Sequence, residues 1–226
     1  MSVKVKAVHD LSVTVGDEDV TWVLAPSVKI TRRRIIGQND NVNAEDLVTP
    51  VHFGTHVDFP FHNIPDGFTG EHYPASLFIG RGNFIDVSHK KENEVLMPSD
   101  LEGHDIQEGD VVLLYYNWYR YRGRNDKYLY DYPGLGVEAA KYLVAKKIRG
   151  VGTDAYNIEQ TPRETIKGPF YAHIELHKKD IWIIEALTDD FKSLIGRKDL
   201  MVAAFPIKLA GVSGAPARVV AIEFAN

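Results

Sequence analysis

The chain has 226 residues, of which 44% are hydrophobic, and a formal charge of −5 at neutral pH. This length and apolar content are enough for a buried core, so residues 1–226 are expected to form a single domain. The slight acidity gives no long-range attraction for nucleic acid, and the one basic run, residues 32–34, is expected to be a solvated edge. Cysteine is absent, which excludes disulfides, thiolate metal ligands and a cysteine nucleophile.

Neither a signal-peptide pattern nor a run of about 18 apolar residues occurs in the sequence. No internal repeat or Gly/Ser linker divides the chain. The expectation is therefore a soluble, cytoplasmic protein without a membrane partner.

Hydrophobic periodicity predicts a mixed α/β fold. Residues 20–36 are rich in β-branched side chains and are predicted to form a strand, as are residues 83–87 and 110–116. Residues 136–148 are predicted to form a helix, because apolar side chains recur every three or four positions and Gly150 stands where a C-cap belongs.

Strand and helix alternate beyond this helix. A short buried strand at 151–154 is followed by a predicted helix at 171–179 and a second buried strand at 181–185. Strands at 201–207 and 219–224 are predicted to complete the sheet, with a turn rich in Gly and Pro between them.

Residues 52–62, His-Phe-Gly-Thr-His-Val-Asp-Phe-Pro-Phe-His, carry three imidazoles and a carboxylate on a short stretch of chain. Thr55, Val57 and Pro60 disfavour a helix here, and Gly54 lets the backbone pass close to a neighbouring group. In extended backbone, side chains two or four positions apart point to the same side. Four side chains are therefore expected to converge on one spot: His52, His56, Asp58 and His62.

This segment resembles the signature of the putative cyclase family, which includes bacterial kynurenine formamidases and isatin hydrolases. The signature, His-x-Gly-Thr-His-x-Asp-x-Pro-x-His, is matched at all of its fixed positions. Further stretches are similar to the family as well, so the resemblance covers nearly the whole chain: Gly152-x-Asp154, the pair His173 and Glu185, and residues 206–208 and 216–218.

The resemblance implies a compact α/β domain of the swivelling β/β/α type, in which mixed sheets curve into a partly open barrel. It also implies that His52, His56 and Asp58 bind one metal ion, and that Asp58 bridges to a second ion held by His173 and Glu185. Isatin hydrolases work with one manganese and lack the second carboxylate, so Glu185 favours two ions here. Zinc is the first expectation and manganese the alternative, and a homo-oligomer, either dimer or tetramer, is expected.

The resemblance assigns proton transfer to His62. Zinc lowers the pKa of a bound water to about 7, and a shared carboxylate can hold two cations ~3.5–4 Å apart. His62 can then take a proton from the attacking water and return it to a leaving nitrogen, which contributes roughly 10²–10⁴-fold. The alternative is that His62 only orients a ligand.

The other histidines are not expected to bind metal. His177 forms a rival His-x-x-x-His pair with His173, but metalloproteases place the glutamate directly after the first histidine, whereas Glu175 stands two positions on. His177 is therefore predicted to be a surface or packing residue. The remaining four are predicted to be ordinary surface or loop residues: His9, His72, His89 and His104.

Aromatic residues surround the expected substrate site. Trp22 is close to the position where formamidases carry a substrate-packing tryptophan, although the residues after it depart from their pattern, and a plain core residue is the alternative. Phe59 and Phe61 are expected to anchor the loop from behind. The Tyr- and Arg-rich residues 115–132 are interpreted as a lid, an oligomer contact or a substrate-selecting loop.

These features predict a metal-dependent hydrolase of the C–N bond in a formamide or small aromatic amide, with N-formylkynurenine as the leading substrate. The alternative keeps the same site but acts on a cyclic amide such as isatin, or on a lactone. A non-enzymatic module with a structural metal is disfavoured, since such sites usually close the coordination shell with four ligands, often cysteines.

Overall fold

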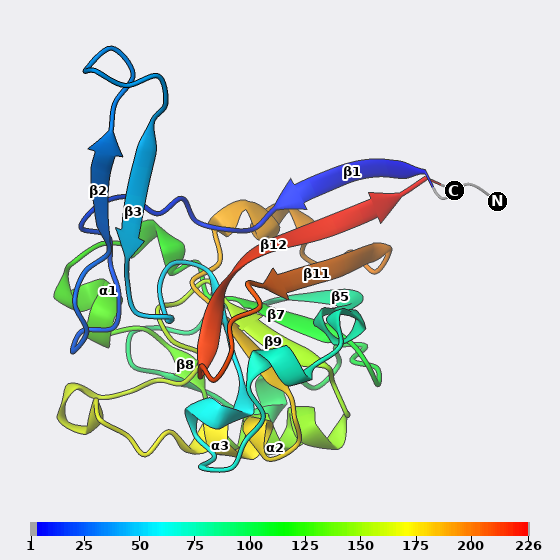
Figure 1. Ribbon diagram of the computed structural model, residues 1–226. Coiled ribbons are helices and arrows are strands. Elements are labelled where there is room, and N and C mark those ends of the chain that lie inside the picture. The colour runs from blue at the N-terminus through cyan, green and yellow to red at the C-terminus, as the bar shows by residue number, and fades with distance from the viewer. Residues whose placement is uncertain (1–3, 226) are drawn as a thin grey trace.

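The structure, a computed structural model, describes residues 4–225 apart from the side chain of Thr165. An eight-stranded sheet lies at its centre, with the strand order β1-β12-β11-β5-β7-β9-β10-β4 (Figure 1). Its strands are β1 (Val5–Asp10), β4 (His56–Asp58), β5 (Ile79–Asp86), β7 (Val111–Tyr115), β9 (Gly150–Thr153), β10 (Trp182–Glu185), β11 (Leu200–Pro206) and β12 (Gly214–Phe224).

The sheet closes into a barrel because the two ends of β12 pair with different strands. Its first residues pair with β4 through Gly214↔Asp58 and Pro216↔His56, whereas its later residues pair with β11 and β1. Seven strands from β4 to β12 thus form a ring that mixes parallel pairs among β5, β7, β9 and β10 with antiparallel pairs elsewhere. The predicted α/β fold with mixed sheets curving into a barrel is confirmed, and β12 closes the barrel.

The residues of the central strands β7, β9 and β10 are buried on both faces of the sheet. In β7, Leu113 packs inside the barrel, while Val112 and Leu114 pack against helices outside it. This two-sided burial explains why the strand has an uninterrupted apolar run in place of alternating polarity. The outer layer is made by α2 (Val137–Ala145) and α3 (Tyr171–His177), which lie against one another, and α1 (Asp126–Tyr130) is a shorter helix (Figure 1).

Short elements complete the fold. Two small sheets pair β2 (Lys29–Arg34) with β3 (Ala44–Val48), and β6 (Val95–Leu96) with β8 (Gly134–Leu135). The 3-10 helices are η1 (Pro60–His62), η2 (Gly70–His72), η3 (Ala75–Phe78), η4 (Pro98–Asp100), η5 (Tyr119–Tyr121), η6 (Arg163–Thr165) and η7 (Asp189–Leu194). No helix in residues 4–225 has the length and apolarity needed to cross a lipid bilayer.

The β2–β3 hairpin projects from the body of the domain (Figure 1). The strand predicted over 20–36 is correct only for residues 29–34, where the basic run is exposed as expected. Residues 20–28 instead turn, and Thr21 forms an isolated bridge with Phe53. Tertiary contact with the segment before β4 therefore outweighs the β propensity of residues 20–28.

Most other predicted elements are present, with shifted ends. The helix predicted over 136–148 is α2, which ends at Ala145 with Lys146 as its C-cap, and Lys147 lies in the left-handed region at φ 55°. Gly150 is not a helix cap but the first residue of β9, where an added Cβ would come within 2.6 Å of the Trp182 ring. The predicted turn before residue 219 is shorter than expected, because β12 already begins at Gly214.

Candidate metal centre

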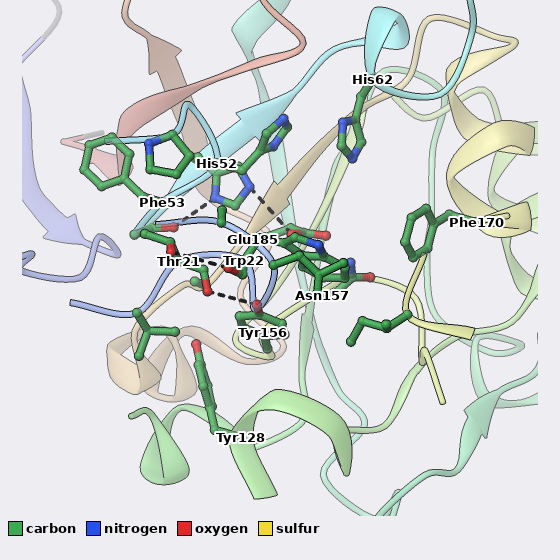
Figure 2. A pocket seen from close by; sticks show the side chains of 18 of the residues that line it. Thr21, Trp22, His52, Phe53, His62, Tyr128, Tyr156, Asn157, Phe170 and Glu185 are labelled. Carbon is green, nitrogen blue, oxygen red and sulfur yellow. Dashed lines mark hydrogen bonds and ion pairs between the residues drawn. The ribbon is translucent and has the colours of Figure 1, made fainter. Parts of the chain in front are cut away.

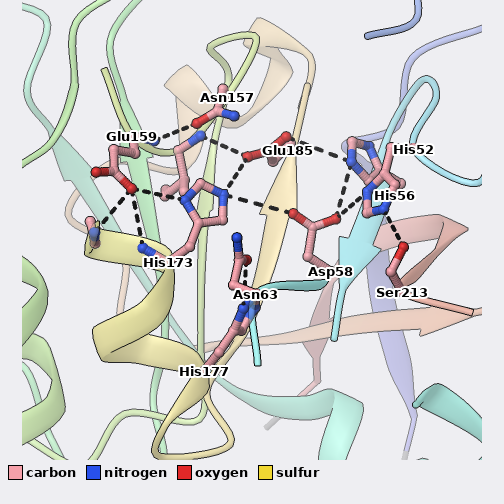
Figure 3. Close-up of polar contacts among 12 residues, drawn as sticks. His52, His56, Asp58, Asn63, Asn157, Glu159, His173, His177, Glu185 and Ser213 are labelled. Carbon is pink, nitrogen blue, oxygen red and sulfur yellow. Dashed lines mark hydrogen bonds and ion pairs between the residues drawn. The ribbon is translucent and has the colours of Figure 1, made fainter. Parts of the chain in front are cut away.

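The first group of ligand-type side chains comes from the segment around β4. Asp58 Oδ1 lies 2.7 Å from His52 Nδ1 and 3.3 Å from His56 Nε2 (Figure 3). His56 and Asp58 are alternate residues of β4 and therefore point to the same side of the strand. One donor atom from each of the three residues falls within 4.8 Å of the others, which is close enough to share one ion.

A second group shares Asp58 with residues from distant elements. His173 Nε2, on α3, lies 4.0 Å from Asp58 Oδ2 and 3.4 Å from Glu185 Oε1. Glu185 is the last residue of β10, which pairs with β4 so that Glu185 stands opposite His56, and its Oε2 lies 3.6 Å from His56 Nε2. The structure thus brings together all five expected ligands, with Asp58 between the two groups (Figure 3).

Each histidine of the two groups uses its second ring nitrogen for a hydrogen bond that fixes the orientation of the ring. The partners are Gly54 O at 2.9 Å for His56 Nδ1, Ser213 Oγ at 2.8 Å for His52 Nε2, and Glu159 Oε2 at 3.1 Å for His173 Nδ1. Because a carbonyl oxygen only accepts, His56 Nδ1 is the protonated nitrogen and its Nε2 is free to coordinate. The bend that allows this contact has Gly54 at φ 55°.

The carboxylates of the centre favour positive charge on the groups beside them. Burial opposes a charge on His56, yet the carboxylates of Asp58 and Glu185 outweigh it and raise its pKa to about 9. Burial likewise opposes a charge on His173, but Glu159 and Glu185 raise its pKa to about 10. Burial would raise the pKa of Asp58, whereas His52 and His56 hold it well below its ordinary value. A divalent cation would supply this charge in place of protons.

The residues fit a metal of the zinc or manganese type. His56 Nε2 is buried and has no hydrogen-bond partner among the described residues, which is unfavourable unless the atom ligates a cation. Three imidazoles with two buried carboxylates are a nitrogen and oxygen donor set, which suits both metals. Asp58 belongs to both groups.

His62 reaches the centre by a different route from the one expected. β4 ends at Asp58, and the 3-10 turn η1 carries His62 back over the site, with its ring centroid 4.3 Å from that of His52 and 6.1 Å from that of His173. Burial lowers the pKa of His62 to about 3, with Asp58 opposing the shift and the neighbouring histidines adding to it. The imidazole is therefore uncharged at neutral pH.

A cavity of about 420 Å³ opens above the centre. His62 and Glu185 line it on the side of the centre, and its other walls combine aliphatic side chains with the aromatic rings of Trp22, Tyr156 and Phe170 (Figure 2). Trp22 stacks on Tyr156 with ring centroids 5.7 Å apart and meets Phe170 edge-on at 6.0 Å. Trp22 therefore both packs on its neighbours and lines the cavity, so that the two interpretations of this residue are compatible.

Other aromatic residues divide between core and cavity. Phe59 is buried in the barrel core, which confirms its anchoring role, whereas Phe61 is 41% exposed and anchors little. From the Tyr- and Arg-rich segment 115–132, Tyr128 and Arg122 line the cavity. Further side chains of this segment are buried in the hydrophobic core: Tyr116, Trp118 and Tyr132. The segment is thus a wall of the cavity.

His177 is a packing residue, which was one of the two roles predicted for it, and not a surface residue. It is only 2% exposed, and its Nδ1 lies 3.0 Å from Asn63 Oδ1, on the residue after His62. Sequence reasoning missed the groups that orient the ligands, Glu159 and Ser213, and it missed Asn157 in the cavity wall. None of the three stands at a spacing that marks a site, so only the folded arrangement identifies them.

A sequence model of the family described as Putative cyclase matches residues 9–160, more than half of the chain. The chain belongs to the putative cyclase family. The matched region contains the signature segment and Glu159, while His173 and Glu185 lie beyond it.

Known proteins resemble the chain over most of its length. The kynurenine formamidase of Sphingopyxis alaskensis is 26% identical over 205 residues, covering 90% of this chain and 92% of that protein. The kynurenine formamidase of Bacillus cereus is 27% identical over 183 residues, covering 81% of each. Isatin hydrolase A from Labrenzia aggregata has the same fold, with a TM-score of 0.83 at 23% identity, covering 96% of this chain and 93% of that one. A protein from Bacillus stearothermophilus, described as a predicted metal-dependent hydrolase, has a TM-score of 0.76 at 29% identity, covering 96% and 98%.

Proposed function

We propose that the protein is a metal-dependent hydrolase that cleaves the C–N bond of a formamide or other small aromatic amide, with N-formylkynurenine as the leading substrate. One observation carries the proposal: two groups of ligand-type side chains share Asp58, and three of their members, His52, His56 and Glu185, line a cavity together with His62 and Trp22. The likeness to curated kynurenine formamidases over 81–90% of the chain supports this reaction class.

The proposed cofactors are two divalent ions, with zinc first and manganese as the alternative. His52, His56 and Asp58 would hold one ion, and Asp58, His173 and Glu185 the other. A bound cation of this kind makes water a nucleophile at neutral pH and polarises the carbonyl that is attacked. Anomalous scattering at the zinc and manganese edges would give both the element and the number of ions.

The catalytic residue proposed from the chain itself is His62. As the water oxygen adds to the formyl carbon, the neutral imidazole accepts a proton from that water. When the C–N bond breaks, the imidazole returns the proton to the nitrogen that leaves. One water is consumed, and the products are the free amine and formic acid. No bond between protein and substrate is required.

Trp22 is the residue proposed to bind the substrate ring. Its indole is held by Tyr156 on one side and by the edge of Phe170 on another, so a flat aromatic substrate meets a rigid wall. The cavity is large enough for an aromatic amide of this size, and its apolar walls keep bulk water away from the bond that is cleaved.

A substrate panel tests the reaction. Purified, metal-loaded protein is expected to hydrolyse N-formylkynurenine faster than isatin or simple lactones. If the protein hydrolyses isatin or a lactone but not the formamide, the proposed substrate is wrong and the alternative, a cyclic amide or lactone, is supported. No turnover of any compound, together with loss of folding on chelation, would favour a structural metal instead.

The substitution His62→Ala tests the proton-transfer role. Turnover is expected to fall by roughly 10²–10⁴-fold, with metal content and fold unchanged. His72→Ala is the matched control, because His72 contacts Thr69 away from the centre and its loss should leave turnover unaltered. A near-normal rate in His62→Ala would leave this residue only an orienting role.

We also propose that residues 1–226 act as one cytoplasmic domain and that the protein is a homodimer or tetramer. The β2–β3 hairpin exposes apolar side chains of Leu47 and Val48, and a two-stranded hairpin is only marginally stable alone. A second copy of the chain is the proposed contact. Light scattering should show an oligomer for the native chain and a smaller species for Leu47→Glu, and cell fractionation tests the location.

A further inference from the structure

Three consecutive residues of the loop after β9, residues 157–159, lie at the centre. The backbone N–H of Ile158 donates to Glu185 Oε1 at 2.8 Å, and Glu159 contacts the ring of His173. The residue before them, Asn157, lines the cavity although it is only 6% exposed. Two of the three residues thus hold ligands, whereas the amide of Asn157 faces the space where a substrate would lie (Figure 2).

The orientation of the Asn157 amide is fixed by its neighbour. The backbone N–H of Glu159 donates to Asn157 Oδ1 at 2.8 Å, and only the amide oxygen can accept this bond. Nδ2 is therefore turned the other way, and in Figure 3 it lies on the side of Glu185. Among the described residues, no hydrogen bond from Nδ2 to another protein group is found, and Nδ2 is not one of the fully buried atoms that lack a partner. Because Asn157 lines the cavity, this free donor is suited to a partner that enters the cavity.

An uncharged donor has a specific advantage at this position. It does not repel a cation held by Glu185 and His173, as a lysine would, and it does not compete with the substrate for that cation, as a carboxylate would. A donor held in advance beside a reacting carbonyl stabilises the negative charge that develops on its oxygen.

We propose that Asn157 is a catalytic residue whose Nδ2 donates a hydrogen bond to the carbonyl oxygen of the amide under attack. This inference rests on the proposed function. As the water oxygen bonds to carbon, the π electrons of the carbonyl move onto the carbonyl oxygen. The hydrogen bond from Nδ2 stabilises the negative charge that develops there. When the carbonyl re-forms, the C–N bond breaks, and its electron pair takes the proton carried by His62.

Two substitutions separate this role from loop support. Asn157→Asp keeps an oxygen that accepts from the Glu159 N–H but removes the donor, whereas Asn157→Ala removes both. Both variants are expected to lower kcat on the arylformamide by roughly 10²–10³-fold, with KM changed only a few-fold. Asn43→Asp is the matched control, because Asn43 also accepts a backbone hydrogen bond but lies in the exposed hairpin loop.

A binding measurement gives a second readout that a structural role would not move. An aryl phosphonamidate, which carries a tetrahedral anionic centre, should bind more weakly to both Asn157 variants, while the aromatic amine product should bind as it does to the native protein. Metal content is measured on the same samples and is expected to be unchanged, and thermal stability should be unchanged for Asn157→Asp but slightly lower for Asn157→Ala, because the Glu159 N–H loses its acceptor. Equal weakening for both compounds would indicate a distorted cavity and overturn the inference.

The outcomes also separate this inference from the function on which it rests. If the native protein hydrolyses no compound of the panel, the proposed function fails and the role of Asn157 fails with it. If the native protein hydrolyses the formamide and Asn157→Asp keeps its kcat, the donor is not used. The inference about Asn157 is then overturned, while the proposed function stands.

Discussion

The two halves of the centre are built in different ways. His52, His56 and Asp58 come from seven consecutive residues around β4. The other half joins Asp58 to His173 on α3 and to Glu185 at the end of β10, more than a hundred residues along the chain. The side chains of the first half therefore come from one local segment, whereas those of the second are brought together by the way the helix packs on the sheet.

This difference is visible in what supports each half. The first half is held by close backbone approach: Gly54 O accepts from His56, and Gly214 lies directly beside the His52 ring. The second half is held by a charged side chain, Glu159, which contacts both the ring and the backbone N–H of His173. Steric changes should therefore damage the first half, and charge changes the second.

The largest effect is expected from Asp58→Ala, because Asp58 is the one residue that both halves share. Loss of a partner that only orients a ligand costs about 10–100-fold in metal affinity or activity, so loss of the shared ligand should exceed 100-fold. Metal analysis should find neither ion bound. Asp66→Ala, an exposed position, is the control. A fully active Asp58→Ala protein would contradict the shared-ligand arrangement.

Glu159→Ala should weaken the second half alone. The expected loss is about 10–100-fold in the affinity of one ion, since the imidazole of His173 loses the carboxylate that orients it. Calorimetric titration of the metal-free protein should resolve one weakened and one normal site. Glu175→Ala, on the same helix but paired with Lys178 at the surface, is the control. Equal weakening of both sites would show that the halves are not independent.

Gly214→Ala should weaken the first half by a smaller amount. An added Cβ would come within 2.6 Å of His52 Cε1 and 2.9 Å of Val57 O, so the ring must move from its position. We expect the affinity of one ion to fall about tenfold, the lower end of the range for disturbed ligand orientation. Gly16→Ala, where an added Cβ meets nothing within 4 Å, should bind metal normally.

The smallest effect concerns the pH dependence of the metal-free protein. The pKa values of His56 and His173 are raised to about 9 and about 10 in the folded chain, above the ordinary value of 6.5. Such groups stabilise the fold fully below pH 6.5, and this contribution is lost as pH rises through 9 and 10.

Thermal unfolding without metal should therefore occur at lower temperature at pH 10 than at pH 7. With saturating metal the two imidazoles are already deprotonated, and this part of the pH dependence should disappear. An unfolding temperature of the metal-free protein that rises over this range would contradict the assignment of charge at the centre.

The same contrast explains which parts of the site the sequence could predict. The signature at 52–62 is compact, so spacing alone was enough to expect that its ligands converge. His173 and Glu185 were expected only from the family resemblance, because twelve residues that pass from a helix to a strand do not define a distance. Ser213, Glu159 and Asn157 could not be predicted, since each acts through contacts between segments that only the fold brings together.

For the fold, elements with strong periodicity were predicted and those decided by long-range packing were not. The helix α2 and the buried strands β7, β9 and β10 follow from apolar patterns that are visible in the local sequence. Residues 20–28 have similar propensity but lie against the cavity and turn. Closure of the barrel also depends on residues 214–216. Their Gly and Pro residues are typical of a turn, so the sequence does not predict that they pair with β4.

The pairing of β12 with β4 has a consequence for the order of maturation. During synthesis from the N-terminus, the segment with His52, His56 and Asp58 is complete long before residues 213–216 exist. Those late residues supply the hydroxyl that faces His52 and the strand that flanks His56 and Asp58. The final geometry of these three side chains therefore depends on residues far along the chain, and a polypeptide synthesised only as far as residue 212 would have the three side chains without the groups that flank them in the folded protein.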